Sequence, residues 1–155
     1  MPTPEFVLAL REKIGHDPLW LCGVTAVVAR GDEVLLVKRS DNAEWTPVTG
    51  IIDPGEEPAV AAAREVLEEA DIVAEAQHLC WVHVIPTVTY PNGDQTQYID
   101  ITFRMSYRSG EPFPADGENT DVRWFPLDAL PPMSDEMRAR IAHALDGVEA
   151  ARFVR

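Results

Sequence analysis

The sequence predicts an α/β fold in one domain, and three observations lead to this prediction. The chain has 155 residues, 46% of them apolar and 25% charged, which is typical of one globular domain with its own core. Segments rich in β-branched and aromatic residues alternate with segments of helical periodicity. The sequence also contains no repeat, linker or low-complexity tract that would divide it. We therefore expect a single domain over residues 1–155.

Three helices are predicted, at residues 4–14, 58–71 and 134–146. The first places Phe6, Leu10 and Ile14 on one face and ends before a glycine. The second has Pro58 at its first position, where proline is well tolerated, and continues with an alanine-rich stretch. The third begins at Ser134, a good N-cap residue, and carries apolar residues at helical spacing.

Strands are predicted at residues 19–29, 33–38, 45–53, 74–90, 95–108 and 121–125. The first two flank the dipeptide Gly31-Asp32, and the two long segments flank PNGD, so each pair is expected to form a hairpin. Residues 40–44 and 109–119 are predicted to be loops.

The charge balance excludes one class of partner. Lys and Arg number 13 and Asp and Glu 26, so the formal net charge is −13. Binding to a nucleic-acid duplex depends on Lys and Arg that neutralise phosphates. We therefore expect no duplex partner.

The chain also lacks the features of membrane and disulfide-rich proteins. It has no apolar run long enough to span a membrane, and its first residues lack the apolar core of a signal peptide. Cys22 and Cys80 are too few for a disulfide framework and lie in apolar stretches, so both are expected to be buried free thiols. These features are typical of a cytoplasmic protein.

An acidic cluster on the second helix is the first sign of chemistry. Glu65, Glu68 and Glu69 fall at i, i+3 and i+4, which places them on one helical face. Such a cluster is either a solvated surface or a site for a hard divalent cation, Mg²⁺ or Mn²⁺. In either case Glu69 is expected to be a surface carboxylate.

The cluster belongs to a longer pattern that resembles the Nudix box, the signature of the Nudix hydrolase family. The matching positions are Gly50, Glu56, Arg64, Glu65, Val66, Glu68, Glu69 and Ile72. Asp71 stands where the family has glycine, and aspartate tolerates the left-handed conformation that ends the helix there. The resemblance covers about residues 20–146 and implies an α/β/α sandwich around a mixed sheet, with the N-terminal helix as an addition.

The resemblance also implies an activity. Nudix hydrolases are metal-dependent pyrophosphohydrolases that cleave a nucleoside diphosphate linked to another moiety by attack of water on phosphorus. ADP-ribose, nucleotide sugars, dinucleoside polyphosphates and nucleoside triphosphates all remain open as small-molecule substrates.

The resemblance assigns roles within the box. It implies that Glu65 and Glu69 are the main ligands of Mg²⁺, or of Mn²⁺. Glu68 would be a further ligand or the general base, and the carbonyl of Gly50 would complete the shell. Arg64 would orient these carboxylates rather than touch the substrate.

Candidates outside the box complete the prediction. Glu118, in the loop DGENTDVRWF, resembles the distal glutamate of several Nudix enzymes and is a candidate base or ligand, with Asp116 as the alternative. Arg39 is a candidate phosphate contact and Tyr90 a candidate for stacking on a base. Trp45, at a position that is often tryptophan in the family, is the third candidate substrate contact. For each of these, an ordinary strand-end or packing role is the alternative.

Two rival functions fit the sequence less well than a hydrolase. A non-catalytic nucleotide-binding module typically lacks box carboxylates, which this chain retains. An isopentenyl diphosphate isomerase uses a cysteine, and neither Cys22 nor Cys80 lies in the box. The sequence leaves a homodimer open, with the N-terminal helix or strand 95–108 as candidate surfaces.

Overall fold

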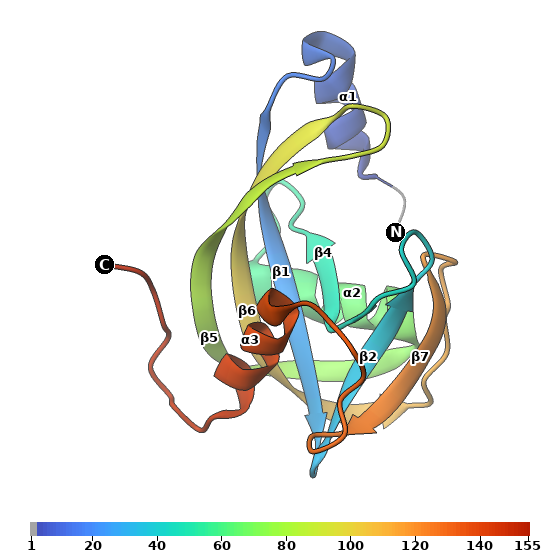
Figure 1. The fold of residues 1–155 in the computed structure, drawn as a ribbon, viewed down its shortest axis with the longest axis vertical. Helices are drawn as coiled ribbons and strands as arrows, with labels where there is room; N and C mark the ends of the chain where they lie inside the picture. Colours follow the sequence, from blue (N-terminus) through green and yellow to red (C-terminus); the bar gives the residue numbers. More distant parts are fainter. Residues whose placement is uncertain (1–2) are drawn as a thin grey trace.

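The structure, a computed structural model, describes residues 3–155. Its helices are α1 (Glu5–Ile14), α2 (Pro58–Ala70) and α3 (Asp135–Leu145). Its strands are β1 (Leu19–Arg30), β2 (Glu33–Arg39), β3 (Trp45–Thr46), β4 (Val48–Ile51), β5 (Ile72–Thr89), β6 (Gln95–Gly110) and β7 (Asn119–Pro126). Figure 1 shows how these elements are arranged.

The strands form one mixed sheet in the order β3-β2-β1-β6-β5, with β4 also paired to β1 and β7 to β2. The pairing of β1 with β6 is parallel, whereas the other pairings are antiparallel. The predicted hairpin of β1 and β2 forms, but it pairs only at its turn, at Ala29–Val34 and Arg30–Glu33. Beyond these pairs the strands diverge, as Figure 1 shows, because β1 takes β4 as its partner and β2 takes β3 and β7.

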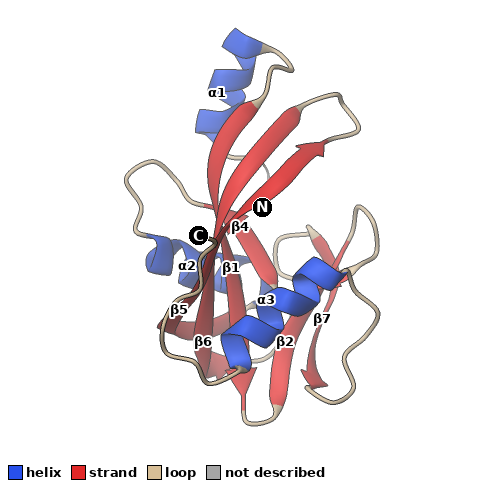
Figure 2. Ribbon diagram, turned by 60° about the vertical axis from the view of Figure 1, so that its left-hand side comes forward, coloured by secondary structure: helices blue, strands red, loops and turns tan. Residues whose placement is uncertain are grey.

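Helices cover both faces of this sheet, which confirms the predicted α/β/α sandwich (Figure 2). On the α2 side, buried residues of β1 and β2 such as Val24 and Leu35 pack against Ala62 and Val66. On the α3 side, the alternate residues of the same strands, Val27, Val34 and Leu36, form a second cluster, together with the helix residues Ile141 and Ala144. Because both faces are covered, the middle of each strand, residues 23–28 and 34–37, is continuously buried.

Three sequence expectations were wrong in detail. The predicted strand 45–53 is divided at Pro47 into β3 and β4, since proline has no backbone N–H for a sheet hydrogen bond. On α1 the buried residue is Val7, and Leu10 is exposed, because the helix projects beyond the sandwich. Cys80 is buried as predicted, but Cys22 is exposed. None of the described helices covers the end of β1 where Trp20 and Cys22 share one face.

Among residues 3–155, no helix is both long enough and apolar enough to cross a membrane.

Helix α2 ends at Asp71, the position where the box departs from the family pattern. Asp71 has φ 55° and ψ 32°, in the left-handed region, and its N–H donates to the carbonyl of Leu67. The aspartate thus adopts the geometry that glycine normally supplies.

Replacing Asp71 tests whether its left-handed backbone conformation costs stability. A side chain in the left-handed region costs up to about 1–2 kcal/mol, and Asp suffers less than most residues. We therefore expect Asp71→Gly to raise the free energy of unfolding by up to about 1 kcal/mol and Asp71→Ala to lower it. Urea denaturation of the three proteins measures this order, and a glycine variant less stable than the parent would contradict it.

Candidate active site

The guanidinium of Arg64 is the centre of a network between β4 and α2. Its Nε and Nη2 donate to the two carboxylate oxygens of Glu56, each at 2.8 Å. Its Nη1 donates to Glu65 at 2.9 Å and to Glu68 at 3.3 Å, and Nη2 also reaches the carbonyl of Ile51 at 3.2 Å. The hydrogen bonds from Arg64 lower the pKa of Glu56, so this ion pair stays charged. Arg64 therefore fixes the loop between β4 and α2 from the helix side.

Glu65 faces the strand that precedes this loop. Its side chain is 1% exposed, and its Oε2 is buried without a hydrogen-bond partner among the described residues. A Cβ atom on Gly50 would lie 2.1 Å from Cδ of Glu65, so the backbone of β4 abuts the carboxylate. Only glycine allows this close approach.

A second group of carboxylates gathers one helical turn away. Carboxylate oxygens of Glu69, Asp116 and Glu118 lie within 4.8 Å of one another. Asn119 donates from Nδ2 to Oε2 of Glu69 at 2.9 Å. Glu69 is 5% exposed, so the expectation of a surface carboxylate was wrong: the loop before β7 covers it.

Backbone hydrogen bonds explain why this loop lies over α2. The last carbonyls of a helix have no partner within it. Here the N–H of Phe113 donates to the carbonyl of Ala70 at 3.0 Å, and that of Ala115 to the carbonyl of Glu69 at 3.4 Å. Asp116 accepts from the N–H of Glu118 at 3.0 Å, which orders the turn. The C-terminal end of α2 thereby brings the two loop acids to Glu69.

Burial changes the titration of the two helix carboxylates. It raises the pKa of Glu65 from 4.5 to about 7, although the charge of Arg64 opposes the shift. It also raises the pKa of Glu69 to about 7, against the hydrogen bond from Asn119. Two neighbouring buried acids that resist ionisation are typical of a site built for a positive partner.

These observations fit a divalent cation. The partnerless oxygen of Glu65, the glycine that makes room beside it and the cluster around Glu69 supply the oxygen donors that Mg²⁺ and Mn²⁺ prefer. Glu68 contributes less directly, since it is 38% exposed and contacts Arg64. The three box carboxylates are therefore divided between two neighbouring groups.

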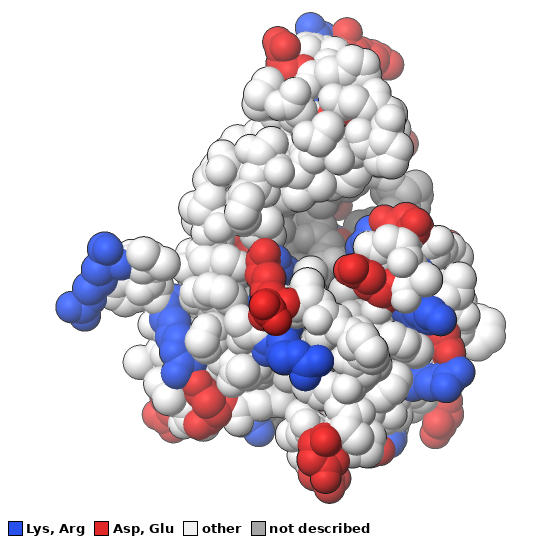
Figure 3. All heavy atoms as spheres, in the orientation of Figure 1, with Lys and Arg blue, Asp and Glu red and all other residues white. Residues whose placement is uncertain are grey.

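An open cleft of about 870 Å³ leads from these carboxylates toward α1 and the hairpin of β5 and β6. Figure 3 shows a hollow beneath the upper lobe that these elements form. Gly50, Glu65, Glu69 and Glu118 line one part of the cleft, and Tyr98 and Arg140 line another. The cleft is therefore large enough for a nucleotide as well as a cation.

The three predicted substrate contacts differ in their positions. Arg39 lines the cleft, where its guanidinium forms a bidentate pair with Asp41 at 2.7 and 2.9 Å. Tyr90 also lines it, and its hydroxyl lies 2.8 Å from that of Tyr98. Trp45 is not among the described residues that line the cleft. Its ring packs against Phe125, with ring centroids 4.8 Å apart.

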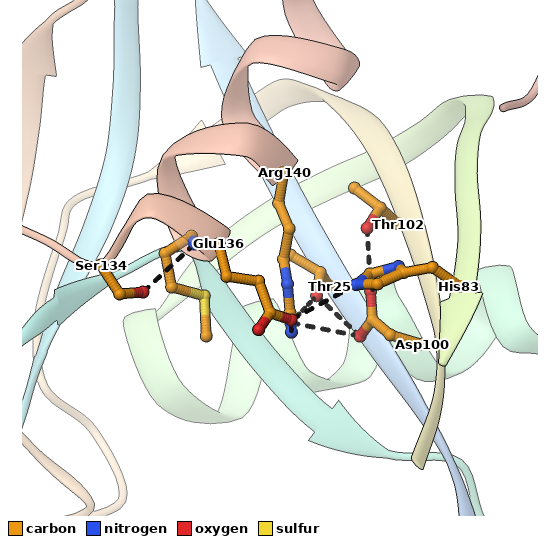
Figure 4. A network of polar contacts seen from close by, with 8 residues as sticks. Thr25, His83, Asp100, Thr102, Ser134, Glu136 and Arg140 are labelled. Carbon is orange, nitrogen blue, oxygen red and sulfur yellow. Dashed lines mark hydrogen bonds and ion pairs between the residues drawn. The ribbon is translucent and has the colours of Figure 1, made fainter. Parts of the chain in front are cut away.

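Sequence reasoning missed two features. Asn119 directly follows Glu118, but only the folded loop shows that its amide faces Glu69. The second is a buried network of Thr25, Asp100 and Arg140 on three different elements (Figure 4). A buried arginine on a helix face predicted to be apolar leaves no signal in the helical periodicity.

Comparison with known proteins gives a consistent result. A profile of the NUDIX domain matches residues 21–146. The NAD-capped RNA hydrolase NudC of Pseudomonas aeruginosa is 32% identical over 123 residues, which are 77% of this chain and 41% of that protein. A MutT-like protein of Streptomyces ambofaciens is 33% identical over 132 residues, 84% of this chain and 80% of that protein.

A solved structure shares the fold. The crystal structure of a NUDIX hydrolase from Nitrosomonas europaea aligns with a TM-score of 0.68 at 23% identity, over 85% of this chain and 76% of that one. The chain spans less than half of the length of the NudC relative.

The raised pKa values predict a pH dependence of stability. Between pH 4.5 and about 7 the folded metal-free protein holds protons on Glu65 and Glu69 that the unfolded chain has lost. The contribution of these two groups to the free energy of unfolding therefore falls as pH rises through this window. Denaturation of the EDTA-treated protein across the window, beside Glu65→Gln/Glu69→Gln, measures it. The double variant should lose this part of the slope, and an unchanged slope would contradict the prediction.

Proposed function

Because the chain belongs to the NUDIX family, we propose that it is a divalent-metal-dependent pyrophosphohydrolase. It cleaves a nucleoside diphosphate linked to another moiety by attack of water on phosphorus. The observation that carries this proposal is the pair of buried carboxylates, Glu65 and Glu69, at one end of an open cleft. Burying two acids without a cation costs free energy. A helix with a purely structural role would gain nothing from this burial.

Glu65 and Glu69 are the main cation ligands in this proposal, together with the carbonyl of Gly50. Glu68 is a further, more exposed ligand. When bound, Mg²⁺ or Mn²⁺ would neutralise pyrophosphate oxygens and promote ionisation of water. The partnerless oxygen of Glu65 and the oxygen cluster at Glu69 support this assignment.

Glu118 is the proposed general base, and the side chain of Asp116 holds the turn that carries it. Glu118 lies in the same oxygen cluster as Glu69 and also lines the cleft, so it is close to both cation and substrate. Asp116 accepts from the backbone of Glu118 and holds the turn in place. A base in this position takes the proton of the attacking water.

Arg64 is a positioning residue. It contacts Glu56, Glu65 and Glu68 and is not among the described residues that line the cleft. It therefore acts on the substrate only through the carboxylates it holds.

Arg39 and Tyr90 are proposed to bind the substrate. Arg39 can exchange its exposed partner Asp41 for a phosphate, because a guanidinium forms the same bidentate contact with both groups. Tyr90 offers an aromatic face in the cleft for a nucleobase. Trp45 packs against Phe125, so we do not include it among the contacts.

The proposal includes several classes of substrate. ADP-ribose, nucleotide sugars, dinucleoside polyphosphates and nucleoside triphosphates all contain the required pyrophosphate. The name of the Pseudomonas relative adds NAD-capped RNA to the substrates worth testing.

A substrate screen tests the proposal. We expect Mg²⁺-dependent release of a nucleoside phosphate from one of these classes, lost with EDTA and restored by excess Mg²⁺. Glu69→Gln should lower kcat/KM by about a hundredfold or more, since a ligand matters at least as much as its hydrogen-bonded neighbours. The Gln oxygen can still accept from Asn119, so the melting temperature controls for folding. Nucleotide binding without turnover would instead favour a non-catalytic module.

A second variant tests the base. Glu118→Gln should lower kcat by about a hundredfold or more at saturating Mg²⁺, because a positioned base contributes at least that much. Glu111→Gln is the matched control, since Glu111 is an exposed acid on the same loop. If Glu118→Gln changes only the Mg²⁺ concentration needed, Glu118 is a ligand and the base assignment is wrong.

A further inference from the structure

In the part of the cleft away from these carboxylates, two strand segments without charged residues form much of the wall, beside the ion pair of Arg11 with Asp94. Residues 76–93, which form most of β5 and its turn, contain no Asp, Glu, Lys or Arg, and neither do residues 19–29 of β1. Figure 3 shows this lobe as largely uncharged below its tip. Leu21, Ile85 and Tyr98 from these strands and β6 line the cleft. Such walls suit a planar, uncharged group.

The floor of this region is polar, and Figure 4 shows its network. Asp100, 2% exposed, accepts from Thr25 and Thr102 at 2.9 Å each and from Arg140 at 3.3 Å. Arg140 also donates to Thr25 at 2.7 Å. Both oxygens of Asp100 are therefore already engaged within the protein.

Glu136 differs from Asp100 in this respect. Its Oε1 accepts from Arg140 at 2.5 Å and lies 3.3 Å from Nε2 of His83. None of the described residues forms a hydrogen bond or ion pair with the other oxygen, Oε2. The side chain is 37% exposed and lines the cleft. One half of the carboxylate is thus fixed, and the other half remains available.

The charge state of Glu136 fits an acceptor. Burial alone would raise its pKa, but the hydrogen bond and charge of Arg140 outweigh burial and lower the pKa below the usual value. The carboxylate therefore stays ionised near neutral pH, where it accepts hydrogen bonds and donates none.

We propose that Glu136 is a specificity-determining residue, whose Oε2 accepts a hydrogen bond from an N–H or O–H group on the nucleoside part of the substrate. The proposal rests on the hydrolase function proposed above. The donor is either an exocyclic amino group of the base or a ribose hydroxyl, which share this chemistry.

A phosphate cannot be the group recognised here. Asp100 and Glu136 are both acidic, and Arg140 is already paired with them. The other arginine in this region, Arg11, donates to Asp17 and Gln95 carbonyls at 2.6 and 2.7 Å and to Thr96 at 3.0 Å. The pyrophosphate therefore lies at the carboxylate end with its cation, and the nucleoside lies over Glu136.

The variant Glu136→Gln reverses the polarity of this contact. The amide oxygen would remain with Arg140, which only donates, so the NH₂ group would turn toward the cleft. Asp135→Asn is the matched control, because Asp135 is exposed, adjacent in the first turn of α3 and not among the described residues that line the cleft. Glu136→Asp keeps the charge opposite Arg140 but withdraws the oxygen, and it serves if the Gln variant folds poorly.

The probes are nucleoside monophosphates, which need no turnover. Calorimetric titration at saturating Mg²⁺ would compare AMP with its analogue lacking the amino group, GMP with IMP, and AMP with deoxyAMP. We expect Glu136→Gln to weaken binding of the donor-bearing member of at least one pair by about tenfold and to leave its partner unchanged. The affected pair identifies the base or the ribose as the source.

The outcomes separate this proposal from the proposed function. Equal weakening within every pair, or no weakening, overturns the role of Glu136 even if the enzyme hydrolyses its substrate normally. Selective weakening in a protein that hydrolyses nothing supports Glu136 and refutes the hydrolase. A KM increase with unchanged kcat in the active enzyme is the matching kinetic signature.

Discussion

The whole site depends on the ion-pair network of one guanidinium, that of Arg64. The loop between β4 and α2 has little regular structure, so its position must be set by side chains. Arg64 contacts the end of β4 through Ile51, the loop through Glu56 and its own helix through Glu65. A guanidinium has five donors in a fixed plane, which suits this geometry, whereas a lysine ammonium could not form the bidentate pair with Glu56. The distance between Gly50 and Glu65 follows from this arrangement.

The site also contains an energetically unfavourable feature, a pair of buried acids on α2. Glu65 and Glu69 are buried acids with raised pKa values, which destabilise the metal-free protein near neutral pH. They stand on a helix whose other buried face, with Ala61, Ala62 and Val66, is well packed in the core. Buried polar groups that lack full hydrogen-bond partners are typical of functional sites. One face of α2 therefore stabilises the core, and another carries the proposed cation ligands.

The features that depend on local sequence patterns could be predicted from the sequence. The elements, the box and the end of α2 at Asp71 follow from spacing, turn residues and propensity within short stretches. The burial of Glu69 could not be predicted, because it requires the loop near Asn119 to cross α2. The network at Glu136 depends on the parallel pairing of β1 with β6, which places Thr25 beside Asp100 across 75 positions of sequence. The exposure of Cys22 likewise depends on which face of β1 the helices leave uncovered, not on the apolar residues around it.

The charges of the cleft are a further argument for the proposed cation. Acidic residues among its described lining outnumber arginines, and each arginine is already engaged: Arg11 by carbonyls, Arg39 by Asp41 and Arg140 by Asp100. The chain as a whole carries a formal charge of −13. A pyrophosphate would therefore meet repulsion along most of the cleft, and Arg39 alone, once it exchanges Asp41 for a phosphate, would not neutralise it. A divalent cation held between acids reverses the sign at one end only. In the proposed function this asymmetry would orient the substrate, because the anionic part would be attracted to that end while the apolar walls near Glu136 suit the neutral part.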